Sequence, residues 1–205
     1  MTKNMGRKAV DVVLLPDEAM MDKVIEANAE MVERFGAEIV LNKENCLPHI
    51  TLAMGCVDAK DTATIEEILQ SISKEFSLGE LRVIGVRTTV NSRGEKVSVF
   101  EVEKTDQLQL LHEKVMKEMS PYFSSDVTGD MMAGQEVSET TLLWIKNYRE
   151  KSSFAKFLPH ITIGYGEIED QSFPVKFAVS KLALCHLGNR CTCRKILLSI
   201  ALGKR

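Results

Sequence analysis

The chain has 205 residues, of which 44% are hydrophobic and 27% are charged, and its formal net charge is −3. This length predicts one domain, or two closely joined halves, with a core large enough to need no disulfides. The slightly acidic balance excludes a dedicated binder of long duplex nucleic acid, which usually presents a strongly basic face, but it leaves room for a small phosphorylated ligand or a strand end.

Taken in chain order, the predicted elements mix helices with pairs of strands. Apolar residues at helical spacing and capping residues at the starts define the helices, and β-branched runs bounded by turn residues define the strands. We predict a strand at 9–15, a helix at 17–35, a short extended piece at 37–41, a strand at 48–55, a helix at 62–76, strands at 80–90 and 96–103, a helix from Thr105 to Pro121, a long mobile loop at 122–137, a helix at 138–152, and strands at 158–166, 174–187 and 191–202. This order indicates an α+β fold with an internal duplication.

No secretion signal or membrane span is expected. The N-terminal segment carries basic residues, but the apolar run at 9–15 is interrupted by Asp11 and stopped by Pro16. No stretch of about 18 apolar residues is present. The five cysteines are odd in number, so we expect a cytoplasmic protein with free thiols and no membrane partner.

One nine-residue phrase occurs twice, at 47–55 and at 158–166. The first copy is Leu-Pro-His-Ile-Thr-Leu-Ala-Met-Gly and the second is Leu-Pro-His-Ile-Thr-Ile-Gly-Tyr-Gly. In a regular strand alternate residues share a face. One face of the first copy is therefore predicted to carry His49, Thr51, Ala53 and Gly55, and one face of the second His160, Thr162, Gly164 and Gly166.

Each of these faces combines an imidazole, a hydroxyl and two small residues, which predicts a binding cleft with an open floor. A bulky side chain at Gly164 is then expected to block the substrate. One imidazole can act as a general base while another acts as a general acid, and threonine hydroxyls can donate to phosphate oxygens. No Asp, Glu or Cys recurs with the two histidines, so the phrase predicts neither a tetrahedral metal site nor a cofactor.

Two His-x-Thr motifs, each in a hydrophobic strand and about half a chain apart, resemble those of the two-histidine (2H) phosphoesterase superfamily, in particular its LigT-like group of 2′-5′ RNA ligases and cyclic nucleotide phosphodiesterases. The resemblance implies one catalytic domain over 1–205, built of two pseudo-symmetric lobes around a central cleft. It also implies metal-independent opening of a 2′,3′-cyclic phosphate, or cleavage or joining of a 2′-5′ linkage, on a nucleotide or RNA end. His49 and His160 would be the acid–base pair, with His49 favoured as the acid, and Thr51 and Thr162 would bind phosphate.

Residues other than the paired histidines and threonines give weaker signals. Arg194 and Tyr165 are candidate substrate contacts, although Arg194 is read equally well as a solvated strand end. Trp144, Tyr148, Tyr122 and Phe123 could stack a base, although Trp144 is expected rather in the core, and His112 is expected in a structural or surface role. Substrate choice is assigned to the rim of the cleft, above all to the loop at 122–137.

Two rival functions remain open from the sequence. The cleft could belong to a binding module that holds a nucleotide or RNA end with little turnover. A zinc hydrolase built on Cys185, His186, Cys191 and Cys193 is the weaker rival, because their spacing is unusual for zinc. Substrates of four kinds fit the motifs: mononucleotide cyclic phosphates, ADP-ribose cyclic phosphate, 2′-5′ oligoadenylate and tRNA halves. No long apolar stripe points to a protein partner, so a monomer is expected.

Overall fold

The computed structural model describes residues 6–91, 93–134, 136–168 and 172–203. Its strands and α-helices are β1 (Arg7–Pro16), α1 (Glu18–Phe35), β2 (Ile50–Asp58), α2 (Thr62–Glu75), β3 (Leu81–Val90), β4 (Lys96–Val102), α3 (Asp106–Met119), α4 (Glu139–Lys151), β5 (His160–Tyr165), β6 (Val175–Phe177), β7 (Val179–Leu187) and β8 (Cys193–Ala201). Short 3-10 turns lie at Ala59–Asp61, Gly129–Met131, Phe154–Lys156 and Asn189–Cys191. None of the helices within these ranges is long and apolar enough to cross a membrane.

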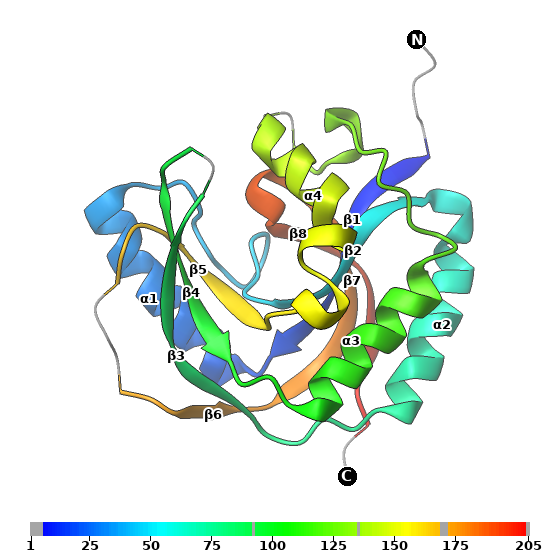
Figure 1. Ribbon diagram of the computed structural model, residues 1–205, viewed down its shortest axis with the longest axis horizontal. Coiled ribbons are helices and arrows are strands. Elements are labelled where there is room, and N and C mark those ends of the chain that lie inside the picture. The colour runs from blue at the N-terminus through cyan, green and yellow to red at the C-terminus, as the bar shows by residue number, and fades with distance from the viewer. Residues whose placement is uncertain (1–5, 92, 135, 169–171, 204–205) are drawn as a thin grey trace.

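The strands form two four-stranded antiparallel sheets, in the orders β2-β1-β7-β8 and β5-β4-β3-β6. In each sheet the strand that carries a His-x-Thr motif lies at an edge, and these two edge strands, β2 and β5, contact each other. Figure 1 shows the two sheets on either side of the molecule with the helices around them. The predicted α+β fold of two lobes is therefore confirmed.

The helices α1 and α3 each lie between two strands of one sheet in sequence and pack on the other sheet. Asp17 caps α1 by accepting a hydrogen bond from the backbone N–H of Met20, and Thr105 caps α3 in the same way from Leu108. The helix α1 follows a strand of the first sheet but packs on β5 of the second, whereas α3 follows a strand of the second sheet and packs on β2 of the first. Each motif strand is thus packed against a helix that follows a strand of the other sheet, β5 against α1 and β2 against α3.

Each motif strand contains one β-bulge, directly after the motif threonine. In the first sheet Val13 pairs with Thr51 and Val12 with Ala53, which leaves Leu52 as the extra residue. In the second sheet Val99 pairs with Thr162 and Ser98 with Gly164, which leaves Ile163 extra. A bulge shifts the alternation of a strand by one residue, so everything after it faces the opposite side.

The carbonyl oxygen at each bulge accepts a hydrogen bond from a buried side chain on a helix. Leu52 O lies 2.7 Å from Nδ1 of His112 on α3, and Ile163 O accepts from Nδ2 of Asn28 on α1 at 2.8 Å. Both side chains are almost completely buried. The two bulges are thereby held by equivalent contacts, and His112 is a core residue.

Several predicted boundaries change. The expected strand at 174–187 is divided at Ala178, because β6 pairs with β3 while β7 pairs with β1, so this segment passes from one sheet to the other. The expected strand at 191–202 begins only at Cys193. Residues 37–41 form no strand.

The loop at 122–137 is packed against the first lobe, apart from residue 135, which lies outside the described residues. Ser124 exchanges two backbone hydrogen bonds with Cys56, and Met131 and Met132 are buried. The loop is therefore fixed to the first lobe at Ser124 and at Met131 and Met132, while residues 125, 126 and 128–130 between these points are exposed.

Candidate active site

A cavity of about 420 Å³ is lined by residues of both motifs. His49 and Thr51 line it from the first lobe, and His160 and Thr162 line it from the second. The contact between β2 and β5 brings these four side chains together from positions more than 100 residues apart. The volume lies within the range of about 300–1,000 Å³ that is typical of small-ligand sites.

The two imidazoles are anchored in the same way. Nδ1 of His49 lies 2.7 Å from the carbonyl oxygen of Leu47, and Nδ1 of His160 lies 2.8 Å from that of Leu158. A carbonyl can only accept, so Nδ1 carries a hydrogen in both rings and Nε2 is left as the nitrogen that exchanges a proton with a ligand. Burial lowers the pKa of both imidazoles below the usual value, which favours a free lone pair at Nε2.

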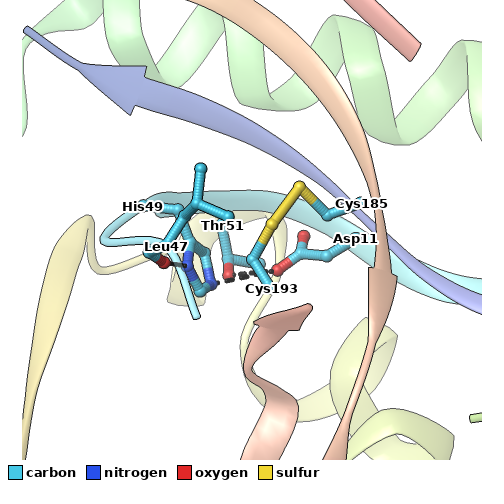
Figure 2. Close-up of a disulfide and its surroundings, with 6 residues drawn as sticks. All are labelled: Asp11, Leu47, His49, Thr51, Cys185 and Cys193. Carbon is cyan, nitrogen blue, oxygen red and sulfur yellow. Dashed lines mark hydrogen bonds and ion pairs between the residues drawn. A yellow bond between two sulfur atoms is a disulfide. The ribbon is translucent and has the colours of Figure 1, made fainter. Parts of the chain in front are cut away.

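Beside His49 lies a buried carboxyl that the motif itself does not contain. Asp11 on β1 is 0% exposed, and its Oδ2 lies 2.6 Å from Oγ1 of Thr51 in a hydrogen bond and 3.6 Å from Nε2 of His49. Figure 2 shows the three side chains meeting next to the disulfide between Cys185 and Cys193. The first motif therefore has an acidic neighbour.

His160 has a different neighbour, the guanidinium of Arg87 on β3. Arg87 lines the cavity and its Nε lies 3.0 Å from Oε1 of Glu101, the strand partner of His160. After burial and the hydrogen bond to Leu158, the positive charge of Arg87 is the next influence on the pKa of His160, and it lowers that pKa. The two lobes thus present their imidazoles in unlike electrostatic surroundings.

A family model described as the 2′-5′ RNA ligase superfamily matches residues 42–198, which include both motifs. The chain belongs to this superfamily. No curated protein sequence matches this chain. The family assignment therefore rests on the family model and on the two motifs within the residues that it matches.

Solved structures show the same fold at low sequence identity. TT0787 of Thermus thermophilus has a TM-score of 0.62 and 14% identity, covering 96% of this chain and 99% of its own. E. coli LigT complexed with 3′-AMP has a TM-score of 0.52 and 16% identity, covering 97% and 99%. E. coli LigT complexed with phosphate has a TM-score of 0.51 and 14% identity with the same coverage. The superfamily fold therefore extends over nearly the whole chain.

The predicted floor of small residues is wrong. Neither Ala53 and Gly55 nor Gly164 and Gly166 line the cavity, which is bordered instead by Met54 and Tyr165 from the same strands. The reason is the bulge at Leu52 or Ile163, which turns each strand over after its threonine. The small residues face packing partners: a Cβ at Gly55 would lie 2.8 Å from the ring of Phe123, and one at Gly166 would contact Phe35.

Gly164→Leu is now expected to destabilise the protein rather than block the cavity. A Cβ at Gly164 would lie 3.0 Å from Nδ2 of Asn28, the amide that binds the bulge carbonyl of Ile163. Overpacking of this kind costs about 1–3 kcal/mol. Urea unfolding should show the loss, with little change in substrate KM for the folded fraction. Unchanged stability together with lost substrate binding would instead show that Gly164 faces the substrate.

Arg190, and not Arg194, reaches the cavity. Arg194 is exposed and packs against Gly188, whereas Arg190 sits in the Asn189–Cys191 turn with φ of 59°. Its guanidinium lies 4.2 Å from the centre of the Tyr165 ring and pairs with Glu38. Tyr165, a candidate substrate contact that strict alternation would turn away from the His-Thr face, lines the cavity because of the bulge at Ile163, and Arg190 covers its ring.

Sequence reasoning missed further residues of the cavity wall. Arg87 and Thr89 on β3 and Asn91 directly after it all line the cavity, a period-two polar pattern that was readable from the sequence. Trp144, expected in the core rather than as a surface for a base, lines the cavity and is 50% exposed.

The cysteines depart from the expected free thiols. Cys185 on β7 and Cys193 on β8 form a disulfide, while Cys46, Cys56 and Cys191 are free. Two sulfurs bonded to each other are not available as thiolate ligands, which removes the zinc interpretation of this cluster. Within the described ranges no group of three or more His, Cys, Asp or Glu side chains is placed to hold a metal ion.

Proposed function

We propose that the protein is a phosphoesterase that acts on 2′,3′-cyclic phosphate or 2′-5′ phosphodiester linkages of nucleotides or RNA ends by two-histidine acid–base catalysis without a metal. The observation that carries this proposal is that two imidazoles from different sheets, each with Nδ1 held by a carbonyl, line one cavity. Membership of the 2′-5′ RNA ligase superfamily supports it.

In the hydrolytic direction His160 is the general base and His49 the general acid. Nε2 of His160 removes a proton from water as the water oxygen bonds to phosphorus, and the bond from phosphorus to one ribose oxygen breaks. His49, protonated for this step, gives its Nε2 proton to that oxygen. Beyond the effect of burial, Arg87 lowers the pKa of His160 against the weaker opposing influence of Glu101, which favours His160 as the neutral base. The charge that lowers the pKa of His49, again after burial, is that of His160 itself. Positioned acid–base groups each contribute about 10²–10⁴ in rate.

The cavity wall supports an anionic ligand with a flat ring. Cationic side chains around it are Arg87, Arg93, Lys151, Lys156 and Arg190. Exposed Trp144 offers a surface on which a base can stack, a contact worth about 1–3 kcal/mol per base. LigT has been crystallised with 3′-AMP and with ATP, which supports a nucleotide as the ligand of this chain.

The decisive experiment is turnover of a substrate panel in the presence of a chelator. Nucleoside 2′,3′-cyclic phosphates, ADP-ribose cyclic phosphate, a 2′-5′-linked oligoadenylate and a tRNA half bearing a cyclic phosphate should be incubated with the protein, and the position of the product phosphate read by NMR. We expect hydrolysis of at least one cyclic phosphate. Tight binding of the product nucleotide with no turnover of any substrate would favour the binding module instead.

A further inference from the structure

We propose that Asp11 is a positioning residue of the first motif: a neutral carboxylic acid that donates its proton to Oγ1 of Thr51 and thereby directs the Thr51 hydroxyl proton to the substrate phosphate. This inference rests on the proposed function, because it gives Thr51 a defined state in phosphate binding. It adds a group that the His-x-Thr pattern does not contain.

The first support is the burial of the carboxyl. Asp11 is 0% exposed, and its Oδ1 is buried without a hydrogen-bond partner among the described residues. Burying an ionised carboxylate with one oxygen unpaired costs several kcal/mol, whereas a neutral acid avoids most of that cost. Burial accordingly raises the pKa of Asp11 well above its usual range, against the weaker opposing influence of Thr51.

The second support is the set of groups that face Asp11. Burial raises the pKa of Tyr148 on α4 and of Cys191 in the Asn189–Cys191 turn, so both face Asp11 as neutral groups, and neither a phenol nor a thiol can supply a positive charge. The strand partner of Asp11 on β7 is Cys185, whose sulfur is in a disulfide. In the described part of the chain, the one basic nitrogen within 4.0 Å is Nε2 of His49, and burial lowers the pKa of that imidazole.

The protonation of Asp11 decides where the Thr51 proton points. A hydroxyl has one proton to donate. An ionised Asp11 would accept a hydrogen bond from the Thr51 hydroxyl across the 2.6 Å contact. The Thr51 oxygen would then face the phosphate with its lone pairs alone. A neutral Asp11 can donate instead, so that Thr51 donates onward, and hydrogen bonds in such a chain strengthen one another. The distance of 3.6 Å to His49 is too long for a hydrogen bond, so Asp11 acts through Thr51.

Comparison of the two lobes shows that packing alone does not require an acid here. Asp11 pairs with Met54, three residues after Thr51, and Val97 pairs with Tyr165, three residues after Thr162. Val97 therefore occupies in the second lobe the position that Asp11 holds in the first. Because the second lobe is built with a valine at this position, strand packing does not explain an acid in the first lobe. We therefore assign the Asp11 carboxyl a polar role.

A double-mutant cycle with a conservative replacement tests the role. Asp11→Asn retains an N–H that can donate to Thr51, so kcat/KM should stay within about threefold of wild type, whereas Asp11→Val should lose about 10–100-fold, as for an unmade buried hydrogen bond. If Asp11 acts through Thr51, adding Asp11→Val to Thr51→Val should cost little more. Additive losses, or an Asn variant as impaired as the Val variant, would overturn the proposal.

Two measurements separate this inference from the proposed function. The carboxyl ¹³C resonance of Asp11 in the unmodified protein should not titrate between pH 3 and about 6, where an ordinary aspartate does; titration in that window would refute the neutral acid. The Kd for adenosine 3′-monophosphate, measured by calorimetry for the same four variants, should follow the pattern expected for kcat/KM. If no substrate is turned over while both results hold, the phosphoesterase proposal fails and the Asp11 assignment stands.

Discussion

Substituting His49 or His160 by alanine is expected to lower kcat/KM for a nucleoside 2′,3′-cyclic phosphate by about 10²–10⁴-fold in each case. Each imidazole presents Nε2 to the same cavity from an Nδ1 that is fixed by a carbonyl. Loss of either removes one of the two proton transfers that the displacement needs. Because the two act in one step, the double variant should fall well short of the product of the single losses. Steady-state kinetics in chelator measures all three.

His186→Ala is the matched control for these substitutions. His186 is half-buried with Nε2 at 2.9 Å from the carbonyl oxygen of Met131, and it does not line the cavity. Its loss should leave kcat/KM within about threefold of wild type. The acid–base assignment fails if a folded His49→Ala or His160→Ala protein keeps more than about a tenth of the activity.

The features that local sequence determines were predictable. The repeated phrase identified both motif strands and the residues that meet in the cavity, and the caps at Asp17 and Thr105 marked the starts of α1 and α3. Such features depend on neighbours within a few residues, and a doubled phrase of this length is specific enough to indicate the superfamily.

The features that depend on strand pairing were not predictable. Alternation assigned Gly164 to the cleft because nothing in the phrase reveals that Ile163 is extra relative to β4; only the register shows it. Asp11 read as an interruption of an apolar run, and its importance appears only once β1 lies between β2 and β7. Arg190 reaches the cavity through a left-handed turn whose direction the Gly188-Asn189 pair does not specify.

Lowering the pH from about 6.5 to 4 is expected to reduce the free energy of unfolding by about 3 kcal/mol through His112 alone. Nδ1 of this ring donates to the bulge carbonyl of Leu52, and Nε2 accepts from the backbone N–H of Phe154 at 2.7 Å. The ring also stacks on Phe157 with 4.0 Å between centroids. Protonation of Nε2 would place its N–H against the backbone N–H of Phe154, so that two donors would face each other. Burial lowers the pKa of His112 to about 4.

The sign follows from proton uptake in the two states. Between pH 6.5 and 4 the unfolded chain binds a proton at His112 that the folded protein does not, so stability is fully present above pH 6.5 and declines as the pH falls. Urea unfolding at several values from pH 7 to 4 gives the slope. Other histidines with lowered pKa contribute to it, which makes the comparison with a variant essential.

His112→Gln isolates the contribution of this ring, because glutamine has a donor and an acceptor but does not titrate. The variant should be less stable than wild type at pH 7, where it lacks the stacking on Phe157, and the difference should shrink as the pH approaches 4. Because Leu52 follows Thr51 and Phe154 leads into the turn before His160, the same substitution should also impair turnover at neutral pH. An unchanged dependence of stability on pH in the variant would show that His112 does not carry the effect.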